Sequence, residues 1–152
     1  LDPDTKISPE VELMLMLSDR KDHVEKTILP NLEKDNWVIS DRFMDSSFAY
    51  QGGGRQLDKN LIISLAEYLN FPQPDLTLLF DLPTEISLSR VMIRGKLDRF
   101  EKEELEFHDR IRKAYLDIAI NNTDRIKVID SSQKLEAMLN NVEKVIEDFF
   151  DE

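Results

Sequence analysis

Residues 76–80 read Leu-Thr-Leu-Leu-Phe, a short run that is apolar at almost every position. Two more short apolar runs occur at residues 37–39 and 126–129, and each is flanked by segments with a helical pattern. Runs that are apolar on both faces and separated by helices are typical of a buried parallel sheet covered by helices. The three runs therefore predict an α/β fold with three layers, a parallel sheet flanked by helices.

Helix start signals follow the same order along the chain. Helices are expected to begin at Asp58, at Thr84, and at Ser131 or Ser132. Near the amino end, Ser8 is a good N-cap and Pro9 suits the first helical position, which predicts a long helix running to about residue 34. Pro30 is expected to kink this helix or to end it early.

Composition excludes several classes of protein. The 152 residues include 20 Lys and Arg against 31 Asp and Glu, and a net charge of -11 disfavours a nucleic-acid partner. With no cysteine, the chain has no disulfide, thiolate metal site or thiol nucleophile. No apolar run approaches the roughly 18 residues of a membrane span, so we expect no membrane segment and a cytoplasmic location. The length suits one domain, residues 1–152, without a linker.

The richest polar segment directly follows the first apolar run. Residues 41–55 read Asp-Arg-Phe-Met-Asp-Ser-Ser-Phe-Ala-Tyr-Gln-Gly-Gly-Gly-Arg and hold three of the four glycines. Ligands of parallel sheets bind beyond the carboxyl ends of strands, where this segment is expected. Arg42 can grip a phosphate through two parallel hydrogen bonds, and glycines at 52–54 allow positive φ. The segment indicates an anion-binding loop; a polar turn with a surface Asp-Arg pair is the alternative.

Two other carboxylates follow the other two runs. Asp81 and Asp130 stand at the carboxyl ends of the predicted second and third strands. They are candidates for ligand binding by position, but we expect them to start loops or to cap helices.

Arg20 lies on an apolar stripe of the predicted first helix. The stripe is formed by Leu13, Leu17, Val24 and Ile28. A charge on such a stripe either extends out to water or meets a buried partner, because a dry unpaired charge is very costly. Six of the seven residues 11–17 are apolar, so this turn is expected to be buried on two sides, by its own sheet and by a second subunit.

A basic cluster near residue 95 has the opposite charge from the whole chain. The cations are Arg90, Arg94, Lys96 and Arg99, with Asp98 as the acid among them. Gly95 interrupts the helical pattern, so residues from about 90 to 101 are interpreted as a lid that closes over phosphates. Solvated helix ends are the alternative.

These three clusters, in this order, resemble the thymidylate kinase family. Residues 41–55 are close to the bacterial family signature, and Arg-Gly-Lys-Leu-Asp-Arg-Phe-Glu at 94–101 also matches. The resemblance implies a P-loop NTPase-like fold, transfer of a phosphoryl group from ATP to dTMP, a need for Mg²⁺, and a homodimer formed through the helix at residues 9–30.

The resemblance also implies roles for residues that bind the acceptor nucleotide. Arg42 is expected to hold the dTMP phosphate, and Asp41 to lie near the magnesium ion and its waters. Ser47 and Gln51 resemble the contacts to the thymine edge. Arg20 resembles the donor to a thymine carbonyl, which would explain a guanidinium on an apolar stripe.

Further roles concern the sugar and the lid. Tyr115 resembles the aromatic residue that lies against the deoxyribose and disfavours a 2′-hydroxyl. Arg94 and Arg99 resemble the lid arginines that neutralise the transferring phosphoryl, while Met92 occupies a position where some relatives carry another arginine. Met16 stands where the family usually stacks a phenylalanine on thymine, and a thioether offers less area and orientation than a ring.

One expected motif is absent from the printed sequence. The 152 residues contain no Gly-x-x-x-x-Gly-Lys-[Ser/Thr] loop, whose amides and lysine would cradle the ATP phosphates. We interpret the chain as part of a longer protein and expect these residues alone to show negligible kinase activity. Two alternatives are a non-catalytic, thymidylate-kinase-like interaction protein and a deoxynucleoside kinase, although the latter explains residues 50–55 poorly.

Overall fold

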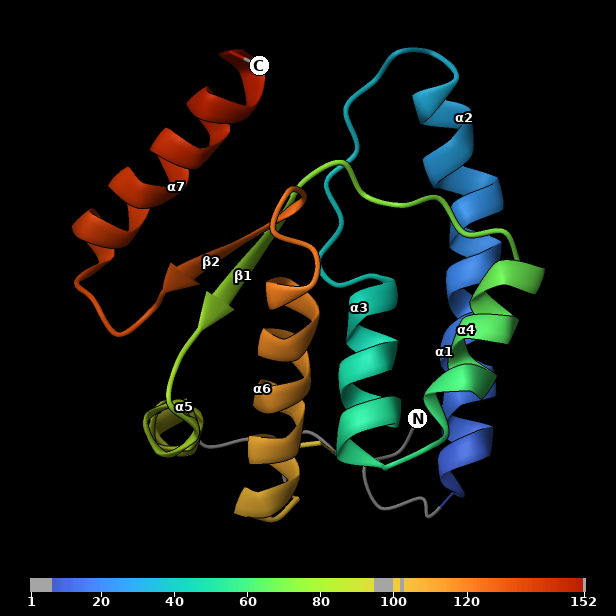
Figure 1. The fold of residues 1–152 in the computed structure, drawn as a ribbon, viewed down its shortest axis with the longest axis horizontal. Coiled ribbons are helices and arrows are strands. Elements are labelled where there is room, and N and C mark those ends of the chain that lie inside the picture. Colours follow the sequence, from blue (N-terminus) through green and yellow to red (C-terminus); the bar gives the residue numbers. More distant parts are fainter. Residues whose placement is uncertain (1–6, 95–99, 102, 152) are drawn as a thin grey trace. The chain divides into compact units, whose positions relative to one another are not determined.

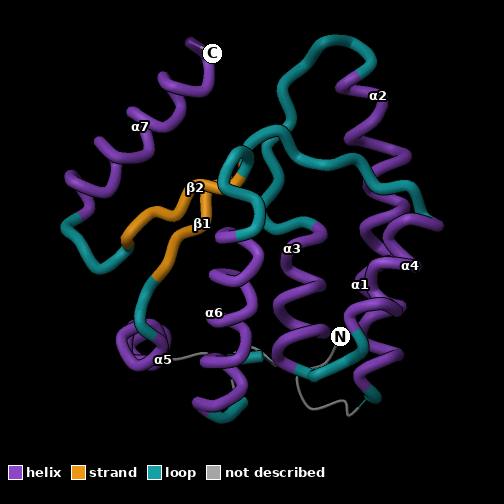
Figure 2. Tube along the Cα trace, in the orientation of Figure 1, coloured by secondary structure: helices purple, strands orange, loops and turns teal. Residues whose placement is uncertain are grey.

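The computed structural model describes residues 7–94, 100–101 and 103–151. By their internal contacts these residues fall into two compact units, one ending at Pro72 and one starting at Gln73. Helices make up most of both units, and the second unit also holds a small parallel sheet (Figures 1 and 2).

The first unit is entirely helical in its regular structure. Its elements are α1 (Pro9–His23), η1 (Val24–Ile28), α2 (Leu29–Leu32), α3 (Met44–Ser47), η2 (Phe48–Gly54) and α4 (Lys59–Tyr68). The predicted start of α1 is confirmed, because the Ser8 side chain accepts a hydrogen bond of 3.3 Å from the Val11 N–H. The helical run ends at Leu32, and the π-helical turn η1 stands just before Pro30, which can donate no backbone hydrogen bond.

The core of the first unit joins α1, α3 and α4. Its buried members are Leu13, Leu17, Met44 and Ile62. Phe43 packs against this core and meets the edge of the Phe71 ring at a centroid distance of 6.1 Å. Burial of these side chains holds the residues that follow Arg42 against the first helix.

Residues 37–39 do not form the strand that the sequence predicts. They lie in a loop, with Trp37 71% exposed and Ile39 98% exposed. A strand exists only when a neighbour supplies hydrogen bonds, and no strand among the described residues pairs with this run. The apolar pattern alone therefore misled the prediction.

The second unit contains the sheet. Its elements are β1 (Thr77–Asp81), α5 (Thr84–Arg94), α6 (Leu105–Ile120), β2 (Ile126–Asp130) and α7 (Leu135–Asp151). Both strands were predicted, and their parallel pairing is confirmed, with Thr77 opposite Ile126 and Asp81 opposite Asp130. The two aspartates therefore end the strands side by side.

Helices α6 and α7 contact the strands, and Figure 1 shows them on either side of the sheet. Ile126 and Ile129 of β2 are buried, whereas Phe80 is 51% exposed and Val128 48% exposed. The expectation that both faces of these strands are buried is therefore wrong, since part of the sheet surface stays open.

Two of the three predicted helix starts are confirmed. The Asp58 side chain caps α4 by accepting from the Asn60 N–H at 2.9 Å, and α5 begins at Thr84. The third is wrong, because α7 begins only at Leu135. Asp130 accepts from the N–H of Ser132 at 2.8 Å, and this side-chain bond stabilises a turn instead of a helix start.

Candidate active site

The motif at residues 41–55 folds as two helices in succession, α3 and the seven-residue π-helix η2. π-Helical turns are rare and occur frequently at functional sites. A Cβ added to buried Gly52 would lie 3.3 Å from Ile62 Cδ1, so α4 packs closely on this backbone. Glycines 52–54, which would allow positive φ, lie within the π-helix η2.

Left-handed backbone occurs instead at Arg42, where φ is 68°. The Ser40 hydroxyl donates to the Arg42 carbonyl at 2.9 Å and braces this bend. The Arg42 side chain is exposed, and its guanidinium carbon lies 4.9 Å from the centre of the Tyr50 ring. A residue with a Cβ rarely adopts positive φ, and such residues concentrate at functional sites.

Arg20 meets a partner on the motif. Its Nη1 donates to Ser47 Oγ at 2.7 Å and approaches Met44 Sδ at 3.5 Å. Its guanidinium also lies over the Phe43 ring, 5.6 Å from the ring centre. The sequence left two alternatives for Arg20, extension into water or a buried partner, and the structure shows a buried partner. That partner, Ser47, is a residue that the family resemblance also assigns to thymine.

A buried carboxylate joins η2 to α1. Glu12 is fully buried and accepts from Arg55 through both oxygens, at 3.2 and 3.1 Å. The Gln51 amide donates to the same carboxylate at 3.0 Å, and Gln51 is only 2% exposed. The sequence interpretation assigned no role to Glu12, although it is the one charged residue in the apolar run 11–17.

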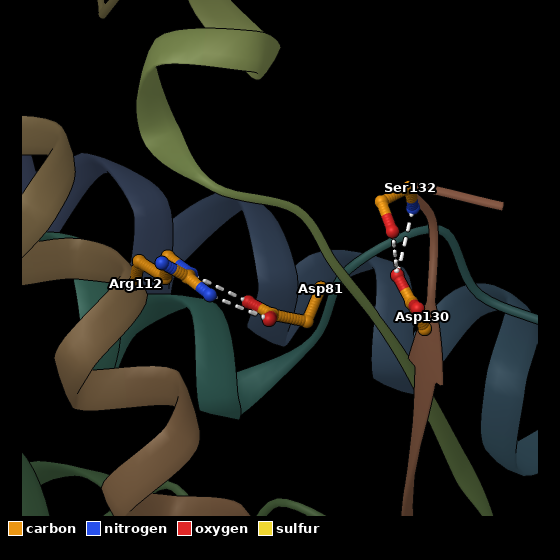
Figure 3. Close-up of polar contacts among 4 residues, drawn as sticks. All are labelled: Asp81, Arg112, Asp130 and Ser132. Atoms are coloured by element: carbon orange, nitrogen blue, oxygen red, sulfur yellow. Dashed lines mark hydrogen bonds and ion pairs between the residues drawn. The ribbon is translucent and has the colours of Figure 1, made fainter.

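In the second unit an ion pair holds α6 to the end of β1. Arg112 donates from Nε and Nη2 to the two oxygens of Asp81, each at 2.8 Å (Figure 3). The hydrogen bond to Asp81 raises the pKa of Arg112. Asp81 thus anchors a helix and does not simply start a loop.

Asp130 is exposed and lies at the end of β2. Besides the Ser132 N–H, it accepts from the Ser132 hydroxyl at 2.6 Å, as Figure 3 shows. The Ser132 hydroxyl first, then its N–H and the Gln133 amide, lower the pKa of Asp130. This confirms the expectation that Asp130 starts a turn.

We expect Ser132→Ala to raise the pKa of Asp130 toward its ordinary value, because the largest stabilising hydrogen bond to the carboxylate is lost. A lowered folded-state pKa contributes stability above the unfolded-state pKa, and this contribution disappears as the pH falls through the folded-state value. NMR titration of the Asp130 carboxyl carbon measures the shift. Ser89→Ala, on α5, is the matched control and leaves the Asp130 titration unchanged; an unchanged titration in Ser132→Ala would contradict the assignment.

The other predicted site residues are placed as follows. Met16 is half-buried on α1, and Asp41 is exposed beside Arg42. Tyr115 is half-buried on α6, three residues after Arg112. Arg94 is the last residue of α5, while its side chain and the whole of Arg99 lie outside the described residues. The structure therefore joins Arg20 with Ser47 but engages Gln51 with Glu12.

Among the described residues, no group of three or more His, Asp or Glu side chains is arranged to hold a metal ion. The same residues include no helix that is long and apolar enough to cross a membrane.

Comparisons with known proteins agree with one another. The family model described as thymidylate kinase matches residues 1–142. A thymidylate kinase of Carboxydothermus hydrogenoformans is 47% identical over 137 residues, which is 90% of this chain and 66% of that protein. One from Neisseria gonorrhoeae is 42% identical over 151 residues, which is 99% of this chain and 73% of the relative. The chain thus spans about two thirds to three quarters of the length of these relatives.

A solved structure is also similar. The crystal structure of thymidylate kinase from Ehrlichia chaffeensis matches with a TM-score of 0.74 at 29% sequence identity. The match covers 93% of this chain and 68% of that one.

Proposed function

Because the chain belongs to the thymidylate kinase family, we propose that this protein transfers a phosphoryl group from ATP to dTMP, giving dTDP and ADP. The observation that best supports this role is the 2.7 Å hydrogen bond from Arg20 to Ser47. These side chains are 27 residues apart, and the resemblance assigns both to the thymine edge. A ligand site needs residues from different elements to converge, and these two do.

The base is held by donors with complementary chemistry. A guanidinium carries five N–H donors, so the bond from Arg20 to Ser47 is compatible with donation to a thymine carbonyl. The Ser47 hydroxyl accepts from Arg20 and can at the same time donate to the base. Met16 supplies an apolar contact to the flat face of the base. The Gln51 amide already donates one hydrogen bond to Glu12, so its role at the base edge requires it to bind the base and Glu12 at the same time.

Arg42 holds the phosphate of dTMP, because its flat guanidinium offers two parallel N–H groups that match two phosphate oxygens. Tyr115 lies against the deoxyribose. Alignment of the acceptor phosphate with the donor supplies much of the catalysis in phosphoryl transfer, where the protein does little covalent chemistry.

Asp41 is the residue that would hold Mg²⁺, through water, beside the donor phosphates. The described residues offer no cage of several carboxylates, but Mg²⁺ keeps several waters and needs only one or two carboxylates besides phosphate oxygens. The exposed Asp41 carboxylate suits that role. The ion offsets charge on the transferring group when bound. Arg94 and Arg99 of the lid add positive charge there.

The exposed apolar side chains of α1 suit a second copy of the chain. Val11 is 47% exposed, and Met14 and Leu15 are each 43% exposed. Apolar surface on one helix face favours association with another such face. A homodimer through residues 9–30 and a cytoplasmic location remain predictions.

Nucleotide preference tests the proposed function. In protein expressed from the whole gene, kcat/KM for dTMP is expected to exceed that for dUMP about fourfold, the worth of one buried methyl group. The preference over dCMP is expected to be about 100-fold or more, since the amino group of cytosine would face the Arg20 donors and leave polar groups unpaired.

Arg20→Met serves as the internal check on this prediction. It removes the donor and is expected to reduce the ratio of kcat/KM for dTMP to that for dCMP. The ratio of kcat/KM for dTMP to that for dUMP is expected to stay near its original value. Equal kcat/KM for dTMP and dCMP in the unmodified protein would refute the proposed base recognition.

A further inference from the structure

The Arg42 side chain lies over an aromatic ring. Its guanidinium carbon is 4.9 Å from the centre of the Tyr50 ring, within the range of a cation–π contact. We propose that Tyr50 is a positioning residue, which holds the Arg42 guanidinium in the orientation that binds the phosphate of dTMP. This inference rests on the proposed function, because it assumes that Arg42 binds that phosphate.

The need for such a contact follows from the exposure of Arg42. A long exposed side chain samples many rotamers, and binding an anion must order them. The left-handed backbone at Arg42, with φ of 68°, fixes the direction in which the side chain leaves the chain. The ring then restricts the guanidinium itself, so less freedom is lost when the phosphate binds.

The cation–π contact and phosphate binding place different demands on the guanidinium. The measured contact joins its central carbon to the ring, whereas the N–H donors lie in the guanidinium plane and point outward at its edge. Both contacts can therefore exist together. A lysine could sit over the ring but would offer no planar pair of donors.

Tyr50 is itself well anchored. The Arg55 N–H donates to the Tyr50 carbonyl at 2.8 Å, inside the π-helical segment. Its neighbours Ala49 and Gln51 are buried, at 0% and 2% exposed, and Gln51 is bound by Glu12. The half-buried ring is thus held by backbone that cannot shift without breaking these contacts.

The test compares two ligands in protein expressed from the whole gene. Dissociation constants for dTMP and for thymidine, which lacks the phosphate, are measured by calorimetry. Tyr50→Leu is expected to weaken dTMP binding about fivefold, the value of an exposed cation–π contact, and to leave thymidine binding unchanged. Tyr50→Phe keeps the ring and is expected to retain the affinity for dTMP. Tyr68→Leu, at an exposed tyrosine of α4, is the matched control and changes neither constant.

A second variant shows whether the effect passes through Arg42. In an Arg42→Ala background, Tyr50→Leu is expected to have no further effect on dTMP binding. Equal weakening of dTMP and thymidine by Tyr50→Leu, or no weakening of either, would overturn the inference. If Tyr50→Leu lowers the melting temperature markedly, the dTMP and thymidine dissociation constants of Tyr50→Met are measured instead, and the same outcomes support or overturn the inference.

The same data separate this inference from the proposed function. If Arg42→Ala leaves the dTMP and thymidine affinities in their original ratio, phosphate binding by Arg42 is wrong. If Arg42→Ala weakens dTMP selectively and Tyr50→Leu does not, only the positioning role of Tyr50 fails.

Discussion

Glu12→Ala is expected to lower the free energy of unfolding by about 3–5 kcal/mol, the cost of leaving a buried charge without its partner. Glu12 is fully buried, and the Arg55 side chain that it binds is only 15% exposed. Gln51 would lose the acceptor of its buried amide as well, which adds a desolvation cost. Urea unfolding followed by circular dichroism measures the change.

Two controls define the origin of this loss. Asp19→Ala removes an exposed carboxylate from the same helix and is expected to change the stability by less than about 0.5 kcal/mol. The double variant Glu12→Met with Arg55→Met removes both charges and is expected to be more stable than Glu12→Ala. A Glu12→Ala protein as stable as Asp19→Ala would show that the buried pair does not hold η2 to α1.

Arg42→Ala is expected to weaken dTMP binding about 100-fold, since it removes two charge-assisted hydrogen bonds to the phosphate. Arg42→Lys keeps the positive charge but lacks the planar pair of N–H donors. We therefore expect an intermediate loss of dTMP affinity, about tenfold. Thymidine has no phosphate and keeps its affinity in both variants. Calorimetric titration with each ligand measures these values.

Lys34→Ala is the matched control for the Arg42 variants. Lys34 is an exposed cation of the same unit, so its removal changes the net charge equally but touches no proposed ligand contact. We expect its dTMP affinity to stay within about twofold of the original, since isolated exposed charges contribute little. An equal loss of dTMP affinity in Lys34→Ala and Arg42→Ala would mean that the overall charge, and not a specific contact from Arg42, attracts the nucleotide.

Local sequence patterns correctly predicted helices whose starting residue is a capping side chain. Ser8 and Asp58 each cap the predicted helix. Such a cap depends only on the next few residues, so a local pattern is enough to predict it. Residues 37–39 carried an equally clear apolar pattern and failed. A strand depends on a partner distant in sequence, which no local pattern specifies.

The candidate residues came from a contiguous motif and from the family resemblance. Residues 41–55 indicated Arg42, the resemblance added Ser47, and the apolar stripe left a buried partner for Arg20 as one of two alternatives. Glu12 was missed because its partners, Gln51 and Arg55, lie 39 and 43 residues away. A lone acid in an apolar run signals a buried partner but does not say which one.

By itself, the sequence determined the family, the two strands that pair and several helix starts, and the residue types available to bind a phosphate and a base. Those properties depend on residues that are close together in the sequence, such as helix caps, periodic apolar positions and contiguous motifs. Only the tertiary structure decided that Ser47 is the partner of Arg20, that Glu12 binds η2, and that Tyr50 underlies Arg42. The pairings of Arg20 and Glu12 arise from packing between segments distant in the chain, where burial makes an unpartnered charge too costly to persist. The contact of Arg42 with Tyr50 lies within one motif, but it depends on the backbone bend at Arg42 and on the helical turn that carries Tyr50.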